Sequence, residues 1–263
     1  MKYILIGSLG LMLLFMNSCS KPAGCVDDQA INYDPTITVA NSSCIYPSIQ
    51  IQFDLKMGNL PFEINRIYNI GGHNTAFKVF QCYLSDIQLI REDQSYMNYD
   101  SLFPLLKEGN TTIPLGEGYV ETFERLTFNV GVPPAENLQI GSYLNNPNHP
   151  LKIQLPDTMH WNLTDGYIFL KMVGKVDRNG DGIPNENESF NMQIGTNDLL
   201  RSIDLSINKS IDEELETIRL ELDVEKLLLN VDLQTEQATK TTDNLLLATK
   251  IADNIVGAIR FVE

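Results

Sequence analysis

The chain has 263 residues, 43% hydrophobic and 20% charged, and its 34 acidic and 19 basic residues give a formal net charge of −15. This apolar share is typical of a globular core and excludes a largely disordered chain. The negative charge argues against binding to nucleic acid or to anionic lipid surfaces, and it attracts cations mildly.

The N-terminus has the pattern of an export signal. Lys2 supplies a positive charge, residues 4–16 form an apolar run, and a small residue, Ser18, precedes Cys19. An apolar run of this length is too short to span a bilayer, which needs about 20 residues. We predict a lipoprotein signal peptide over residues 1–18 and a lipid anchor at Cys19, with a plain cleaved signal peptide as the alternative. The expected location is the cell envelope, on the periplasmic or the outer face of the outer membrane.

The three remaining cysteines are expected in a compartment where disulfides persist. Cys25 and Cys44 are the natural pair, and closing this loop would stabilise its segment by roughly 3 kcal/mol in the chain-entropy model. Cys82 lies in an apolar, strand-like run and is expected to be a small buried hydrophobe, with a metal ligand as the alternative.

The segment around this cysteine pair is compact and rich in Asp, Asn and Ser. It resembles a short cysteine-bounded repeat of exported Bacteroidetes proteins. The positions that carry the resemblance are Asp27, Ala30, Asn32, Tyr33, Pro35, Ser43, Cys44 and Tyr46. The resemblance implies a disulfide-bounded stalk over residues 19–47, placed before the main domain.

From Ser48 onward, apolar residues recur at every second position, which is typical of half-buried strands. Clusters of Gly, Pro and Asn separate these runs at spacings that suit a β-sandwich. The runs are Ile49 to Leu55, Phe77 to Leu89, Arg125 to Val130, Tyr167 to Val173, Ser189 to Ile194, Ser202 to Ile207 and Thr217 to Val224. We therefore predict a mainly β fold, an antiparallel β-sandwich over residues 48–263.

Two segments are expected to be short helices. The first spans Val224 to Leu229, in one or two turns. The second is the C-terminal stretch that starts at Leu245, behind Thr242 and Asp243, either of which can cap a helix N-terminus.

The stretch from Asp177 to Glu188 matches the spacing of a twelve-residue calcium loop. Gly182 permits the sharp turn in its middle. The predicted ligands are Asp177, Asn179, Asp181, Ile183 through its carbonyl, Asn185 and Glu188. The segments on both sides of the loop have strand-like patterns, so we expect a calcium-loop hairpin with a stabilising role. A metal-free hairpin turn is the alternative.

Histidine is scarce, with His73, His149 and His160 as the only three in the chain. His160 lies between Met159 and Trp161, the single tryptophan. Imidazole and thioether groups are copper ligands. The alternative from the residues alone is that Trp161 is a core aromatic and His160 its satisfied neighbour.

Several segments, in order, resemble the MbnP-like copper-binding domain family, over about residues 49–263. They are Phe53 to Leu55 with Gly58; Gly72 and Phe77 to Leu89; Leu126 to Asn137; His149 to Leu151; Met159 to Trp161 with Gly166 and Tyr167; and Ile251 to Asn254. The resemblance implies a β-sandwich in the periplasm or on the cell surface that binds copper through histidines. In some relatives, a tryptophan oxidised to kynurenine joins the site.

Carried over by position, Trp161 is the residue open to such oxidation and His160 is the best-matched imidazole. This chain departs from the family pattern at Gln193, where a histidine is expected. A further ligand would have to come from His73, His149, Met192 or Gln193 itself. The candidate copper ligands are therefore His160, Trp161 and Met192.

No catalytic motif is found, so we expect a protein that is not an enzyme. The predicted function is an envelope lipoprotein that binds copper or delivers it, with a redox or copper-transport protein as partner. The alternative is a calcium-stabilised structural or adhesive module that has lost the copper site of its relatives.

Overall fold

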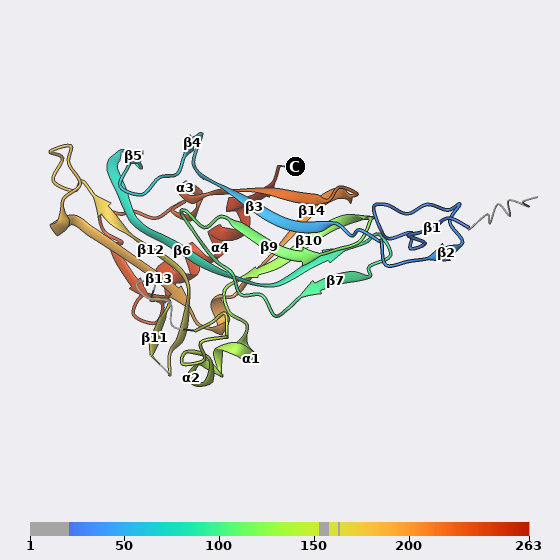
Figure 1. The fold of residues 1–263 in the computed structure, drawn as a ribbon. Coiled ribbons are helices and arrows are strands. Elements are labelled where there is room, and N and C mark those ends of the chain that lie inside the picture. Colours follow the sequence, from blue (N-terminus) through green and yellow to red (C-terminus); the bar gives the residue numbers. More distant parts are fainter. Residues whose placement is uncertain (1–20, 153–157, 163, 263) are drawn as a thin grey trace, which may run out of the picture.

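The structure is a computed structural model that describes residues 21–152, 158–162 and 164–262. The predicted signal peptide and Cys19 lie outside the described residues. Within them, strands dominate and pack as two main sheets (Figure 1). The prediction of a mainly β fold is confirmed.

Period-two patterning explains the strands. In β3 (Ser48–Met57), Ile49, Ile51 and Phe53 are buried while the glutamines between them are partly exposed. Successive side chains of a strand point to opposite faces, so this alternation gives β3 one core face. Because the inner faces of both sheets are apolar in this way, they close over a common core.

The larger sheet has β6 as its longest strand. Its main path is β14 (Arg201–Ile211), β10 (Glu121–Val130), β6 (His73–Ile90), β12 (Gly166–Val176), β13 (Ser189–Gly195) and β16 (Ala238–Lys240). Four shorter strands pair off this path: β5 (Ile67–Ile70), β7 (Tyr96–Tyr99) and β8 (Leu105–Lys107) with β6, and β11 (His160–Asn162) with β12.

The smaller sheet is ordered β17 (Ile259–Phe261), β15 (Leu215–Asp223), β3 and β4 (Leu60–Pro61), and β9 (Thr112–Glu117) pairs with β3. Its central pair, β3 with β15, is parallel, as is β13 with β16. The sandwich is thus mixed, whereas the sequence predicted antiparallel pairing. Parallel pairing needs a long connection, and the chain between β3 and β15 supplies one.

The main core joins the two sheets. Phe53 of the smaller sheet meets Phe128 of the larger sheet edge to face, with ring centroids 6.2 Å apart. Burying one such side chain contributes about 1.5–3 kcal/mol. A second, smaller cluster forms around Tyr83, Met159 and Tyr167, and Trp161 packs against it. This second cluster lies under β11, the strand that carries His160 and Trp161.

Both predicted helices are present, as α3 (Val224–Leu227) and α4 (Leu245–Ala258). The cap of α4 is not the predicted Thr242 or Asp243 but Asn244, whose side chain accepts a hydrogen bond from the N–H of Leu247. Asp243 instead accepts a bond from the N–H of Lys240. It is therefore used in the preceding turn and is not free to cap the helix.

Four further short helical turns were not predicted, because segments of three or four residues carry no readable apolar period. They are α1 (Pro134–Asn137), α2 (Ile140–Tyr143), η1 (Glu186–Glu188) and η2 (Asn197–Leu199). In the part of the chain that the structure describes, no helix has the length and apolar character needed to cross a membrane.

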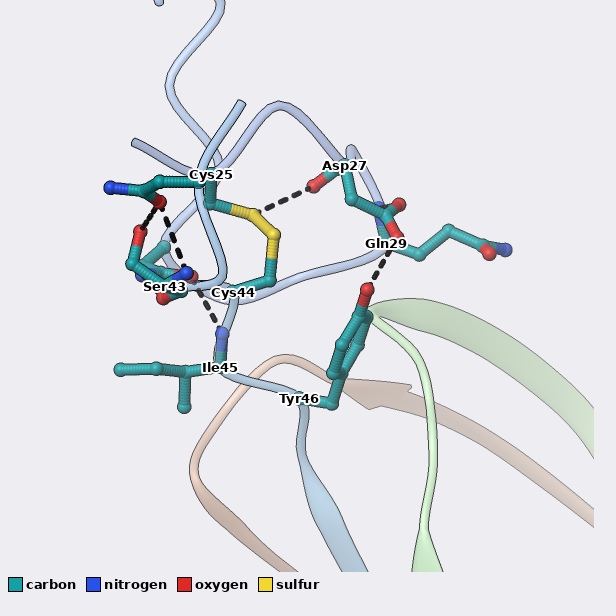
Figure 2. Close-up of a disulfide and its surroundings, with 9 residues drawn as sticks. Cys25, Asp27, Gln29, Ser43, Cys44, Ile45 and Tyr46 are labelled. Atoms are coloured by element: carbon teal, nitrogen blue, oxygen red, sulfur yellow. Dashed lines mark hydrogen bonds between the residues drawn. A yellow bond between two sulfur atoms is a disulfide. The ribbon is translucent and has the colours of Figure 1, made fainter. Parts of the chain in front are cut away.

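The stalk lies at one end of the molecule, where β1 (Ala23–Gly24) pairs with β2 (Val39–Ala40) (Figure 1). Cys25 and Cys44 form a disulfide, as predicted (Figure 2). Cys82 is a free cysteine, fully buried in the main core, which agrees with its predicted role as a small hydrophobe.

Candidate functional site

Two of the three predicted copper residues, His160 and Trp161, lie on β11, a three-residue strand at the side of β12. His160 pairs with Tyr167, and the carbonyl of Met159 accepts a hydrogen bond from the N–H of Ile168 at 3.0 Å. Met159 is buried in the second cluster, and this anchors the strand. His160 and Trp161 follow it as half-buried side chains.

Trp161 is held on the surface of β13. Its indole N–H donates to Oε1 of Gln193 at 2.6 Å, and the amide nitrogen of Gln193 donates to Asn191 at 3.1 Å. The ring covers Gly195, where a Cβ atom would come within 2.6 Å of the indole and of the Tyr167 carbonyl oxygen. Glycine at 195 therefore allows the indole to lie directly against the strand.

His160 and Trp161 form part of the wall of a pocket of about 730 Å³. The other lining residues are mostly polar. They are Asn137, Leu138, Asn162, Thr164, Asp165, Gly166, Thr196, Asn197, Lys240, Thr242 and Asp243. A pocket of this volume is in the range of small-molecule sites and is far larger than a bare ion requires.

Asn137 joins three elements at this pocket. Its Oδ1 accepts from the N–H of Tyr167 at 2.9 Å, and its Nδ2 donates to Asn197 at 3.0 Å. Gly166 must be a glycine here, since its φ is +82° and a Cβ would lie 2.4 Å from the Asn137 oxygen. Asn137, Asn197 and Gln193 were not predicted to shape the site, because their contacts join residues at least 30 positions apart in sequence.

Both carboxylates of the pocket wall are engaged in local turns. Asp165 accepts from the side chain of Asn162 at 2.6 Å, and Asp243 accepts from the N–H of Lys240 at 2.6 Å. Among the described residues of the wall, His160 is the one imidazole. Burial lowers the pKa of His160, so the ring is neutral at neutral pH and can offer a lone pair to a metal.

The other predicted sulfur and nitrogen donors lie elsewhere. Met192 is fully buried in the main core, next to Met172 across the sheet, while its neighbour Gln193 points to Trp161. Adjacent strand residues face opposite sides, so Met192 is directed away from the pocket. The structure does not bring this predicted ligand together with His160 and Trp161.

His73 and His149 are also separate from the pocket. A ring nitrogen of His73 lies 2.8 Å from the side-chain amide of Gln234, and the ring of His149 stacks on Tyr143 with centroids 3.7 Å apart. Among the described residues, no group of three or more His, Cys, Asp or Glu could hold a metal ion. Among its described residues, the pocket wall thus offers one imidazole, while the Gln193 oxygen accepts the indole N–H of Trp161.

The calcium-like loop joins β12 to β13. Asp177 accepts from the N–H groups of Gly180 and Gly182 at 2.9 and 2.8 Å. Asn74 of β6 donates to the Gly182 carbonyl at 2.9 Å, which ties the loop to the turn between β5 and β6. The loop conformation is therefore set by hydrogen bonds between its own residues and this turn.

Glu188 closes the loop from its other end. Its Oε1 accepts from the N–H groups of Arg178 and Asn179, both at 2.9 Å, and its Oε2 from that of Asn185 at 3.1 Å. Burial raises its pKa, but these hydrogen bonds outweigh burial and hold the pKa below its usual value. An ionised carboxylate has about four lone-pair sites, so acceptor capacity remains for a cation.

Comparison with known proteins identifies the family of this chain. The family model MbnP matches residues 46–244, which is more than half of the chain. Among solved structures, MbnP from Methylosinus trichosporium is similar at 16% identity and a TM-score of 0.49, covering 71% of this chain and 79% of that chain. No curated protein matches. On the extent of the family match, this chain belongs to the MbnP family.

Proposed function

We propose that this protein is exported to the cell envelope, is held there by a lipid on Cys19, and binds copper at His160 beside Trp161. The observation that carries the proposal is the pocket wall: one strand, β11, contributes both a neutral imidazole and the single indole of the chain to the wall of one pocket, in a chain of the MbnP family. Imidazole is an effective ligand of copper in either common oxidation state.

The donor set favours transfer over storage. His160 is the one strong ligand in the described pocket wall, and the Gln193 oxygen already accepts the indole N–H. Copper held by few protein ligands leaves by ligand exchange, so a partner that offers more donors would take it. We therefore propose delivery of copper to an envelope partner, with no catalytic turnover.

The test is elemental analysis of the protein purified from its native envelope, together with the intact mass of the peptide that contains Trp161. We expect about one equivalent of copper, a stoichiometry set by the single site. A mass increase on that peptide would place an oxidised Trp161 at the metal. Calcium without copper on unmodified Trp161 would contradict the proposal.

Copper binding should depend on pH through His160. A proton and a metal compete for the same lone pair, so binding is present above the pKa of His160 and is lost as the pH falls through it. Because burial lowers this pKa, the loss should occur below the ordinary value of about 6.5. A copper titration from pH 8 to pH 4 measures the midpoint. A midpoint above the ordinary histidine range would exclude this imidazole as the ligand.

A second function rests on the loop from Asp177 to Glu188. The alternative is a structural or adhesive envelope module stabilised by calcium, and the observation in its favour is that this loop is pre-shaped, with carboxylates at both ends aimed inward. Hard cations such as calcium prefer oxygen ligands of this kind.

Calcium should then raise the melting temperature, because a ligand at 100 times its Kd stabilises the folded state by about 2.7 kcal/mol. The substitution Glu188→Gln should abolish this shift. The matched control is Glu186→Gln, since Glu186 is in the same turn but forms ion pairs with Lys78 and Lys175. The measurement is the melting temperature of each protein with added calcium and with a chelator. An identical melting temperature under both conditions would contradict the hypothesis that this loop binds calcium.

A further inference from the structure

The segment of residues 21–46, which we call the arm, has little core of its own. Cys25 and Ala30 are its buried hydrophobic residues, while Tyr33, Val39 and Ile45 are exposed. So small a unit cannot be held by hydrophobic burial alone and needs a covalent or polar framework. The arm must therefore be shaped by its disulfide and its hydrogen bonds.

The disulfide and the hydrogen bonds of this framework join residues within the arm (Figure 2). Besides the Cys25–Cys44 bond, the N–H of Ile31 donates to the Ile45 carbonyl at 2.8 Å, and the N–H of Ile45 donates to Oδ1 of Asn32 at 2.8 Å. These bonds join Ile45, which directly follows the disulfide, to residues 31–32 inside the loop that the disulfide closes. The last residues of the arm are thus fixed relative to its first turn.

The arm also contacts the domain, at the short connection between β9 and β10. The N–H of Val120 donates to the Gln29 carbonyl at 2.9 Å. Two residues earlier, the N–H of Gly118 donates to the Pro47 carbonyl at 2.8 Å. Residues 118–120 therefore bind both the arm and the start of the chain that leads into β3.

Tyr46 links the two sides of this contact. Its ring meets Tyr119 of the domain edge to face, with centroids 5.9 Å apart, and its hydroxyl donates to the Asp27 carboxylate of the arm at 2.5 Å. A hydrogen bond to an ionised acceptor is stronger than one between neutral groups. The Tyr46 side chain thus contacts the domain through its ring and Asp27 of the arm through its hydroxyl, and Figure 2 shows the bond to Asp27.

We infer that the arm is a rigid extension of the domain, clamped by Tyr46, and not a flexible tether. It then sets the direction in which the domain projects from the part of the chain before residue 21. In Figure 1 the arm extends from one end of the molecule, opposite the end that carries β5 and the calcium-like loop. This role is independent of any metal.

Backbone ¹⁵N relaxation of the purified protein tests the inference without any mutation. We expect arm residues 25–45 to tumble with the domain, with order parameters near the value of about 0.85 found for rigid backbone. Order parameters below about 0.6 across the arm would overturn the inference, because they would mean a flexible tether.

Variants then test the clamp, with the Val120 amide as the reporter of docking. Tyr46→Phe keeps the ring and removes the hydroxyl, and we expect exchange of the Val120 amide to speed up by about tenfold, as for the loss of one charge-assisted hydrogen bond. Tyr46→Ala should release the arm further. The control is Tyr33→Phe, which alters an exposed tyrosine of the same arm.

Fluorescence of the single tryptophan, Trp161, checks that the domain of each variant is folded. A folded Tyr46→Ala protein with Val120 exchange and arm relaxation like those of the unmodified protein would show that Tyr46 is not the clamp. Should that variant not fold, Tyr46→Phe and the relaxation of the unmodified protein still decide the question.

Discussion

We expect the substitution His160→Ala to lower copper affinity at the proposed site by about 100-fold or more, since even the loss of a partner outside the first ligand shell costs about 10–100-fold at metal sites. The physical reason is the donor set. In the described pocket wall, His160 is the one imidazole, both carboxylates are engaged in local turns, and Met192 is buried on the far side of β13. Among the described residues of the wall, no second imidazole is present to replace His160.

The measurement is a competition titration against a copper chelator of known affinity, on matched protein samples. His73→Ala and His149→Ala are the controls, because each removes an imidazole that lies outside the pocket, at Gln234 and Tyr143 respectively. Both should leave the affinity unchanged. If His160→Ala retains full copper binding while a control loses it, the proposed site is misplaced.

Replacing Gly195 with alanine destabilises the protein by about 1–3 kcal/mol, the usual cost of overpacking a filled site. The added Cβ would lie 2.6 Å from the Tyr167 carbonyl oxygen and 2.6 Å from the Trp161 ring. The carbonyl belongs to β12, which pairs with β13 and cannot easily move. The indole ring of Trp161 must therefore move away from Gly195, and its hydrogen bond to Gln193 should break.

Chemical denaturation measures the stability change, and the emission of Trp161 reports the ring because this is the single tryptophan of the chain. We expect a red-shifted emission as the indole becomes more exposed. The matched control is Gly257→Ala in α4, where an added Cβ meets nothing within 4 Å. Alanine is the better helix former by about 0.5–1 kcal/mol, so this control should be neutral or stabilising. Equal stability and equal emission for Gly195→Ala would contradict the close packing of Trp161 on β13.

Local patterns in the sequence were enough to predict the class of the fold. The alternation of Ile49, Ile51 and Phe53 predicts β3, and the stretch from Leu245 behind the possible capping residues Thr242 and Asp243 predicts α4. These predictions succeed because side-chain periodicity is a property of neighbouring residues. The Cys25–Cys44 disulfide was predictable for a related reason, since only one short loop could be closed in the arm.

The family resemblance was also readable from ordered motifs, but it did not establish which side chains meet. From the sequence, Met192 was predicted as a copper ligand, and its neighbour Gln193 was an alternative. The structure separates them, because Gln193 faces Trp161 and Met192 faces the core. Which of two adjacent residues faces a pocket depends on the register between strands, and a shift of one residue exchanges the faces.

The sequence by itself therefore determined the seven longer strands, the disulfide and the presence of one histidine next to the single tryptophan. Tertiary structure alone decided the parallel pairing of β3 with β15, the contact of Trp161 with Gln193 and the docking of Gln29 on Val120. Each of these joins residues far apart along the chain. Such contacts depend on how whole sheets pack and align, and no local pattern of residues encodes that arrangement.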